Sequence, residues 1–411
     1  MEAGREERFL REIEELSGEL VGNLLELIRI PSVNPPGENY KEIVDLLASL
    51  MEEAGLKVSV FEPPQSLLES LKLKPPRPSI VGILEAETPG KTLHLNGHYD
   101  VVPAGEGWTS NPFQPKVEGG KIFGRGAVDM KGGLASMLTA LKALSKVGLP
   151  SGRVIFSVVP DEESGGLAGA GFLVEKHLPK GDAAIIGEPS GVGRISLANF
   201  GALWLEVTVH GKAAHTTMYR LGVNAVEKAA SLILELSKLK RRLEKRKTRF
   251  AMSRSCETAA INVGGLISGG LRVNMLPDRC TFTIDRRLIP EETLEEAERE
   301  LLQALKEAEE KDPQLKIEVK QVFSAKPVST SETSEICLAA SSAVKTILGV
   351  NPVFSGFPGF TDMRFFAEHM PAITYGPGNP EIVHSPNEHI AIKELLTAAK
   401  VYGLTTLRFL S

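Results

Sequence analysis

The stretch LHLNGHYDVVP, residues 93–103, decides how this 411-residue chain is interpreted. It begins as a strand pattern and places His98 at the point where that strand would end in a loop, with Asp100 two residues further on. Catalytic groups commonly lie on such loops, held by a rigid sheet. We therefore looked for other polar residues that directly follow strand patterns in the chain.

Strand patterns alternate with helix patterns through the first half of the chain. Apolar segments occur at 57–61, 79–85, 91–97, 153–159 and 182–187, and helix patterns cover the opening residues to about Ile30, then 38–54, 131–146 and 166–176. This alternation predicts an α/β domain with a mixed, largely parallel sheet flanked by helices.

The order of strand and helix patterns changes after about residue 200. Strand and helix patterns follow one another as β-α-β-β-α-β up to residue 323, which is the order of a ferredoxin-like unit with a split βαβ core. We therefore expect a catalytic domain at 1–198 and 325–411, interrupted by an inserted α+β domain at 199–324. His384 lies in the returning segment, so that segment must rejoin the first half for a shared site to form.

The composition is that of a soluble globular protein, with 42% hydrophobic and 24% charged residues. A net charge of -5 gives no support for nucleic-acid binding, and we interpret the basic run at 238–249 as a solvated helix end. The three cysteines are far apart, and the charged N-terminus lacks the apolar core of a secretion signal. Since no apolar run approaches a membrane span, we expect a cytoplasmic protein that contacts neither membrane nor nucleic acid.

Acidic residues follow further strand patterns. Glu162 and Glu163 come just after 153–159, Glu188 follows 182–187, and Asp129 precedes a glycine pair and a helix pattern. Each of these residues has an alternative interpretation without catalytic function, since Asp129 could cap a helix and adjacent glutamates are normally on the surface. Together with His98 and His384 they supply nitrogen and oxygen ligands, which suit zinc and also cobalt or manganese. Loops at the ends of successive parallel strands converge at one sheet edge, so a two-metal hydrolase is the first hypothesis.

Eight segments in sequence order resemble a known family. The chain resembles the zinc-dependent aminoacylase, glutamate carboxypeptidase, acetylornithine deacetylase and succinyl-diaminopimelate desuccinylase family of co-catalytic metallohydrolases. The segments are GHYDVVP, GRGAVDMKGG, DEESGG, IIGEPS, VHGKAAHTT, DRRLIPEE, GFTDMRF and YGPGNPEIVHSPNEHI.

The resemblance implies a role for each site residue. His98 and Glu188 would hold one divalent ion, Glu163 and His384 a second, and Asp129 would bridge the two. Zinc is the expected ion, with cobalt or manganese as alternatives. Asp100 would orient His98, and Glu162 would be the general acid and base.

The same resemblance implies an inserted lid that dimerises and contacts substrate through a small set of residues. His215 would bind the attacked carbonyl oxygen in the partner's site, although it could also be a surface histidine at a strand end. Arg287 would clamp a substrate carboxylate or else simply pair with Asp285. Asn274 and Gly359 are the other candidates for substrate contact.

We expect hydrolysis of an amide, with Glu162 taking a proton from water and returning it to the leaving nitrogen. In the family that the chain resembles, glutamate rather than aspartate at position 188 is typical of the aminoacylase and deacylase branch, so the resemblance favours an N-acyl amino acid such as N-acetylornithine or N-succinyl-diaminopimelate. A carboxypeptidase or dipeptidase is the alternative enzyme. A scaffold protein that retains the fold is the alternative from another class, and it would purify without stoichiometric metal.

Overall fold

The computed structural model describes residues 2–176, 178, 181–252 and 256–411, which form two compact units. The larger unit comprises Met1–Leu197, Thr330–Ser355 and Thr361–Ser411, and the smaller comprises Ala198–Ser329 and Gly356–Phe360. The sequence-based division placed 356–360 in the returning catalytic segment. The structure groups these five residues with the inserted unit. There the amide of Phe200 donates to the carbonyl oxygen of Phe357, and the amide of Gly356 donates to the carbonyl oxygen of Ala251.

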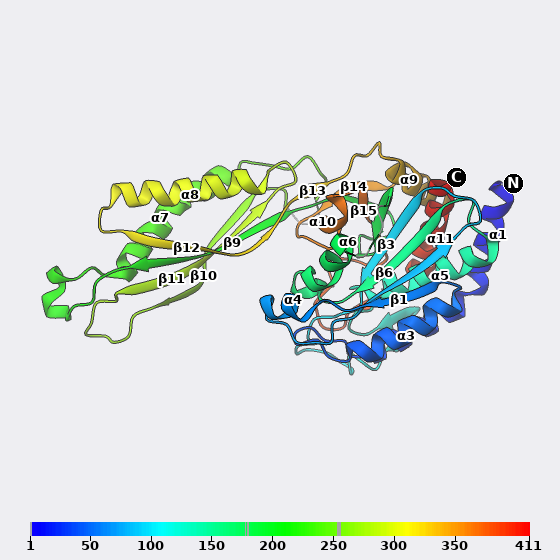
Figure 1. Ribbon diagram of the computed structural model, residues 1–411, viewed down its shortest axis with the longest axis horizontal. Coiled ribbons are helices and arrows are strands. Elements are labelled where there is room, and N and C mark those ends of the chain that lie inside the picture. The colour runs from blue at the N-terminus through cyan, green and yellow to red at the C-terminus, as the bar shows by residue number, and fades with distance from the viewer. Residues whose placement is uncertain (1, 177, 179–180, 253–255) are drawn as a thin grey trace. The chain divides into compact units, whose positions relative to one another are not determined.

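A mixed sheet forms the middle of the larger unit, as the alternation of patterns predicted (Figure 1). Its central strands pair in parallel in the order β6-β3-β7-β15, whereas β1, β2 and β8 add antiparallel partners at the two sides. Two further short strands, β13 and β14, pair with β8. The bounds are β1 Lys57–Phe61, β2 Ser79–Glu85, β3 Thr92–His98, β6 Arg153–Val159, β7 Ala183–Ile186, β8 Arg194–Asn199, β13 Val328–Ser329, β14 Val353–Phe357 and β15 Ala372–Thr374.

Helix α5 (Lys131–Val147) is buried along most of its length, packed among α1, α2 and α11 and against the sheet. Glycines at its start make this packing possible, since a Cβ on Gly133 would lie 2.4 Å from the carbonyl oxygen of Gly187. The N-terminus of α5 is thereby held close to the end of β7. The other helices of the unit are α1 Glu2–Glu15, α2 Ser17–Arg29, α3 Tyr40–Glu53, α4 Gln65–Ser70, α6 Phe172–Lys176, α9 Glu335–Leu348, α10 Met363–Ala367 and α11 Ile392–Leu410.

A second, three-stranded sheet joins the returning segment to the first half. Strand β16 (His389–Ala391) pairs antiparallel with β5 (Lys121–Phe123), which pairs with β4 (Lys116–Glu118). This pairing brings the segment that follows His384 beside the segment that leads into Asp129.

The smaller unit is a four-stranded antiparallel sheet in the order β10-β11-β9-β12 with α7 and α8 packed on one face (Figure 1). This is the ferredoxin-like arrangement predicted from the sequence. Alternate residues of β11 are buried, and they pack on the apolar faces of both helices. The bounds are β9 Gly201–His210, α7 Ala225–Leu243, β10 Ala260–Gly269, β11 Arg279–Leu288, α8 Leu294–Lys311 and β12 Lys316–Ala325.

Two helix predictions differ from the structure. The opening pattern is divided into α1 and α2 at Leu16, and the helix predicted over 166–176 starts as a π-turn at Leu167–Gly171 before the short α6. Glycines explain the second difference, because a Cβ on Gly169 would lie 2.1 Å from the carbonyl oxygen of Pro160. The chain passes too close to the end of β6 for a regular helix there.

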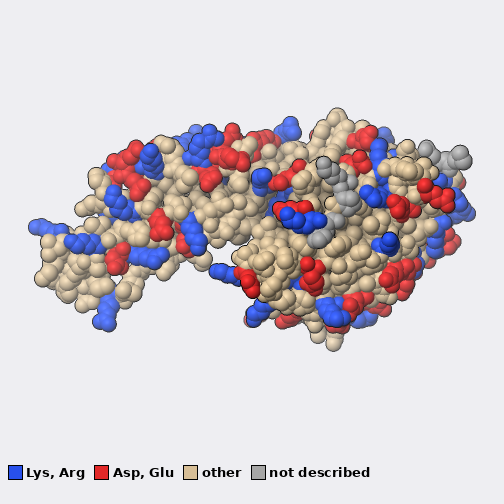
Figure 2. Space-filling model, in the orientation of Figure 1, with Lys and Arg blue, Asp and Glu red and all other residues tan. Residues whose placement is uncertain are grey.

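The basic run at 238–249 belongs to a surface of mixed charge. Figure 2 shows acidic and basic side chains interspersed over the visible face of the smaller unit. Arg246 pairs with Glu292 at 2.8 Å and with Glu300 at 2.7 Å, and Lys247 pairs with Glu257 at 3.3 Å. Within the described residues, none of the helices is both long enough and apolar enough to cross a bilayer.

Candidate metal centre

His98 is the last residue of β3 and is almost completely buried between two parallel neighbours. Its Nδ1 lies 2.9 Å from the backbone carbonyl oxygen of Asp100, and 3.4 Å from the Oδ1 atom of the same residue. A carbonyl can only accept, so Nδ1 carries a hydrogen, and loss of the second ring proton leaves the lone pair at Nε2. The predicted orienting role of Asp100 therefore involves its main chain as well as its carboxylate.

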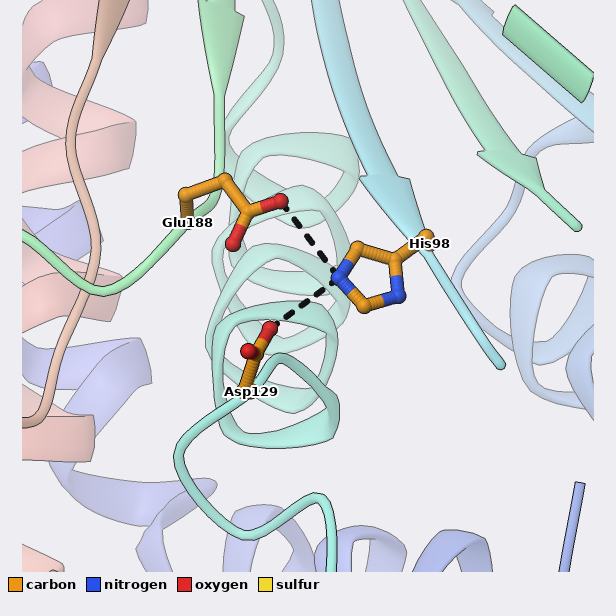
Figure 3. Close-up of side chains that lie close together, drawn as sticks. All are labelled: His98, Asp129 and Glu188. Atoms are coloured by element: carbon orange, nitrogen blue, oxygen red, sulfur yellow. Dashed lines mark hydrogen bonds and ion pairs between the residues drawn. The ribbon is translucent and has the colours of Figure 1, made fainter. Parts of the chain in front are cut away.

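Asp129 ends the loop that leads into α5, and its two carboxylate oxygens face two different imidazoles. Oδ1 lies 3.1 Å from Nε2 of His98, and Oδ2 lies 3.1 Å from Nε2 of His384. Figure 3 shows the first of these contacts, with Glu188 approaching the same nitrogen from β7 at 3.4 Å. A carboxylate in this position is suited to bridging two cations.

Glu163 and His384 are 221 positions apart in the sequence and meet on the other side of Asp129. Nε2 of His384 lies 3.2 Å from Oε1 of Glu163. Glu163 stands in a short 3-10 turn, Glu162–Ser164, which directly follows Asp161 in the left-handed region at φ 65°. His384 is also left-handed, at φ 59°, and its side chain is half exposed. Such backbone is uncommon for residues other than glycine and is often found at functional sites.

These contacts form two groups of three candidate ligands. His98, Asp129 and Glu188 make one group and Asp129, Glu163 and His384 the other, with the ligand atoms of each group within 4.8 Å of one another. The five residues predicted as ligands are therefore together, and Asp129 is common to both groups. Nitrogen and carboxylate donors of this kind suit zinc, cobalt or manganese.

The site concentrates negative charge in a buried place. Burial and the neighbouring Asp129 carboxylate raise the pKa of Glu163 to about 7, against the hydrogen bond from His384. Hydrogen bonds to Asp129 and Glu163 raise the pKa of His384 to about 10. Burial also raises the pKa of Glu188, opposed by the charge on His98. Buried carboxylates are costly unless cations compensate them, so this cluster fits divalent ions.

Glu162 lies beside the ligands without belonging to either group. It is half-buried in the turn that carries Glu163. Burial raises the pKa of its carboxyl well above the usual range, and the Glu188 carboxylate adds to the rise. A glutamate with a raised pKa is suited to holding and releasing a proton near neutral pH.

A buried polar network that the sequence analysis did not foresee supports the turn at Glu162–Ser164. Asp161 accepts hydrogen bonds from Tyr40 at 3.0 Å, from Asn34 at 3.3 Å and from Arg77. Asn34 also donates to Oδ2 of Asp100 at 2.8 Å, so one amide links the residue behind His98 to the residue before Glu162. These partners lie 66 to 127 residues apart, and no local pattern predicts such contacts.

Asp362 is a second residue without a predicted role. It is 2% exposed, and its Oδ2 atom has no hydrogen-bond partner among the residues that the structure describes. Burial raises the pKa of its carboxyl to about 8, opposed by the positive charges of His98 and Arg364. Its place in the GFTDMRF segment, which carries the resemblance, is the one sequence signal that pointed to it.

His215 and Asn274 lie in exposed loops of the smaller unit that are hydrogen-bonded to each other. The amide of Thr216 donates to the carbonyl oxygen of Asn274 at 3.1 Å, and His215 forms an isolated bridge with Met275. Nδ1 of His215 accepts from the amide of Thr217 at 3.3 Å, and it also lies 2.8 Å from the Oγ1 atom of Thr217. Because Nδ1 accepts, a neutral His215 carries its hydrogen on Nε2.

Arg287 and Gly359 also belong to the smaller unit. Arg287 pairs with Asp285 at 2.9 Å and lies over the rings of Trp204 and Phe360, each centroid 5.8 Å from its guanidinium carbon. The structure thus contains the ion pair with Asp285 that the sequence left as one of two alternatives. Gly359 lies in the loop after β14, where an added Cβ would lie 3.0 Å from the ring of Phe357. A hollow of about 280 Å³ beside β10 is lined by Asp285 and Arg287 among other residues.

Searches of solved structures return chains with this fold over nearly their whole length. Human carnosine dipeptidase 1 is 19% identical, with 98% of each chain covered and a TM-score of 0.75. An M20 family metallo-carboxypeptidase from Sulfolobus solfataricus is 21% identical, with 95% of this chain and 99% of that chain covered and a TM-score of 0.74. A dinuclear metal-binding M20 peptidase from Bacillus subtilis is 18% identical, with 97% and 99% covered and a TM-score of 0.70.

An α/β sheet that gathers imidazoles and carboxylates at the ends of its parallel strands defines the class of a metallohydrolase. The chain belongs to peptidase family M20/M25/M40, whose family model matches residues 94–408. The resemblance noted in the sequence is confirmed, and the chain is a hydrolase of this peptidase family.

Proposed function

We propose that the protein hydrolyses an amide bond with two divalent ions, one held by His98 and Glu188, one by Glu163 and His384, and both by Asp129. One observation carries the proposal: the two oxygens of Asp129 each lie 3.1 Å from a separate imidazole nitrogen. Bound ions of this kind lower the pKa of a water and polarise the carbonyl under attack. Zinc is the ion that we propose, with cobalt or manganese as alternatives.

Glu162 moves the proton in this scheme. Its carboxylate accepts a proton from the attacking water, and its carboxyl then donates that proton to the departing nitrogen. The raised pKa of Glu162 supports the second step, because it favours the protonated carboxyl that donates to the departing nitrogen. Asp100 holds His98 in the tautomer that presents Nε2 towards Asp129 and Glu188.

For the substrate we propose an N-acyl amino acid, such as an N-acetyl or N-succinyl derivative. The support is the glutamate at position 188, which in the family resembled is typical of deacylases. A peptide substrate is the second candidate, and the dipeptidase and the carboxypeptidase among the similar structures favour it.

Hydrolysis of matched substrates separates these two candidates. The chelator-treated protein is reloaded with zinc, cobalt or manganese and assayed against N-acetyl and N-succinyl amino acids and against dipeptides of the same amino acids. We expect kcat/KM to be higher for the acyl derivatives, and a preference for the dipeptides would establish the second candidate instead. Absence of metal-dependent hydrolysis of either kind would contradict the enzymatic proposal itself.

The smaller unit supplies the remaining proposed contacts. His215 would donate from Nε2 to the carbonyl oxygen under attack in a partner subunit's site, whereas Asn274, Arg287 and Gly359 would contact substrate. The half-buried guanidinium of Arg287 would bind a substrate carboxylate after its ion pair with Asp285 breaks.

A homodimer through the smaller unit is part of the same proposal. Large apolar side chains are exposed on α7 at Leu234 and on the edge strand β10 at Leu266 and Ile267, where another chain could cover them. Sedimentation should give a dimer, and Leu234→Glu should weaken it. A protein that remains monomeric at micromolar concentration would contradict this part.

We also propose a cytoplasmic location. Cys280 and Cys337 are buried and form no disulfide, which is the usual state of cysteines in a reducing compartment. Fractionation of cells that express the full chain tests this proposal, and recovery in a secreted or membrane fraction would contradict it.

A further inference from the structure

Glu388 is a completely buried carboxylate four residues after His384, and both of its oxygens are occupied. Oε1 accepts from the amides of Val128 at 2.7 Å and Asp129 at 3.1 Å. Oε2 accepts from the guanidinium of Arg125 at 2.6 Å and from the amide of Gly126 at 3.2 Å. A single side chain from the returning segment thus holds the main chain of the loop that ends in Asp129.

The loop 124–129 is shaped to receive an anion. Gly126 has a φ of +85°, and a Cβ there would lie 2.8 Å from the side chain of Val101. Successive amides that turn inward around such a residue form a concave donor site for negative charge. Glu388 fills this site, so the loop's shape depends on a residue about 260 positions away in the sequence.

Arg125 extends the same connection to the loop after β3. Its Nη2 donates to the carbonyl oxygen of Ala104 at 3.1 Å, and its guanidinium lies over the ring of Trp108, 5.2 Å from the centroid. Arg125 and Glu388 therefore join three loops, which follow His98, precede Asp129 and follow His384. Each loop adjoins a proposed metal ligand.

The segment around His384 needs such an anchor. His384 and Asn387 both have a φ of 59°, a conformation that costs energy for residues other than glycine. The side chain of Asn387 accepts from the amide and hydroxyl of Thr109 at 2.9 Å each, and the amide of Gly124 donates to the carbonyl oxygen of Glu388 at 3.0 Å. Glu388 is thus the point where the strained segment is tied to the Asp129 loop.

We propose that Glu388, paired with Arg125, is the positioning residue that sets the distance between Asp129 and His384, and so the affinity of the ion those two residues share with Glu163. This inference rests on the proposed two-metal function. Glu388 touches neither ion nor substrate in this scheme, and it acts by holding the Asp129 amide while its own chain carries His384. Because neither His98 nor Glu188 lies on the segment that carries Glu388, the ion that those two residues share should be affected less.

The most specific test of this proposal is the substitution Glu388→Gln. Glutamine preserves the shape, but its NH₂ group would meet the donors of Gly126 or Arg125 where a carboxylate oxygen accepts. The matched control is Glu292→Gln in the smaller unit. Glu292 is also a nearly buried carboxylate that pairs with a buried arginine, Arg286, at 2.5 Å and accepts from the amide of Ile289 at 3.1 Å, but it holds no loop with a proposed ligand.

The test is calorimetric titration of the chelator-treated full-length proteins with Zn²⁺, together with the visible absorption of Co²⁺. We expect the wild type to bind two ions, and Glu388→Gln to bind one of them about 10- to 100-fold more weakly, with a smaller change for the other. Glu292→Gln should lose thermal stability and keep both affinities. The Co²⁺ spectrum of the weakened site should change in Glu388→Gln alone.

Three results would overturn the inference. In the first, Glu388→Gln binds both ions as the wild type does. In the second, Glu292→Gln weakens metal binding to the same extent, which would make the effect one of general stability. In the third, the wild type binds no ion, and the two-metal proposal then fails along with the inference.

Glu388→Gln leaves the buried Arg125 without its charged partner. If this prevents folding, the double variant Arg125→Met/Glu388→Gln serves as the second test. It leaves neither member of the Arg125–Glu388 pair as an unpaired buried charge, and we expect it to fold and still to bind the shared ion about 10- to 100-fold more weakly. Wild-type affinity in that folded double variant would also overturn the inference.

Discussion

The proposed ligands of the larger unit and the proposed substrate contacts of the smaller unit are built in opposite ways. His98 is 1% exposed at the end of a central strand, and its Nδ1 atom is hydrogen-bonded to the backbone carbonyl oxygen of Asp100. His215 is exposed, and its nearest partners are the hydroxyl and amide of Thr217, two residues along the same loop. One imidazole is fixed by the fold, and the other is fixed only by its own turn.

This contrast indicates what each region contributes. Buried ligands that are held by other buried polar groups keep their geometry before anything binds, which favours tight metal binding. An exposed histidine on a loop keeps its freedom and can form its contact only when a substrate or a partner subunit arrives. Changes in the first region should therefore alter metal binding, and changes in the second should alter turnover alone.

The largest effect is expected from Asp129→Asn. The change removes the charge and one of the two oxygens that face the imidazoles, so we expect both ions to be lost and hydrolysis to fall to background. Elemental analysis and the substrate assay measure the two effects. Asp182→Asn is the control, because the Asp182 carboxylate accepts from the amide of Thr92 at 2.7 Å, at the start of β3, and is not a proposed ligand. Retention of two ions by Asp129→Asn would contradict the proposal that Asp129 bridges them.

Glu162→Gln should separate metal binding from proton transfer. Glu162 belongs to neither ligand group, so the variant should retain two ions while kcat falls by about 10²- to 10⁴-fold. Steady-state kinetics on the metal-loaded variant measures this fall. Near-normal turnover would refute the assigned role.

His215→Ala should lower kcat by about 10²- to 10³-fold, the usual cost of removing one donor to an oxyanion. Metal content should not change, because His215 is no ligand in the proposed scheme. His210→Ala is the control, since His210 is exposed in the same unit and lies 3.5 Å from Glu318. If both variants retained full activity, the smaller unit would have no catalytic contact through His215.

The smallest effect concerns the stability of the metal-free protein and its dependence on pH. Burial raises the pKa of Asp362 to about 8 in the folded chain, above its ordinary value of 3.8. A raised pKa means that the contribution of Asp362 to stability is complete below pH 3.8 and is lost as the pH rises to about 8. The free energy of unfolding of the wild type should therefore fall between these limits relative to Asp362→Asn, as urea titrations at several pH values would show. Parallel pH profiles would contradict the raised pKa.

The sequence predicted the helices and strands that local patterns encode. A strand pattern followed by a polar residue placed His98 and Glu188 correctly at strand ends, and the alternation of strands and helices predicted both units. The helix expected over 166–176 was wrong in its first half, because the glycine spacing reflects close passage beside Pro160. Propensity does not report such a tertiary approach.

The supporting residues could not be predicted in this way. Glu388 and Arg77 act on residues 259 to 263 and 84 positions away, and their sequence surroundings show no periodicity that points to those partners. Glu388 lies in a segment that carried the resemblance, but its proposed positioning role follows only from the hydrogen bonds with Asp129 and Arg125. The backbone carbonyl of Asp100 is a similar case, since sequence reasoning considered only its side chain.

Anomalous diffraction from crystals of the zinc-loaded protein tests the central claim most directly. The account predicts two zinc peaks on either side of the Asp129 carboxylate, one beside His98 and Glu188 and the other beside Glu163 and His384. A single peak, or peaks that do not share Asp129, would contradict it.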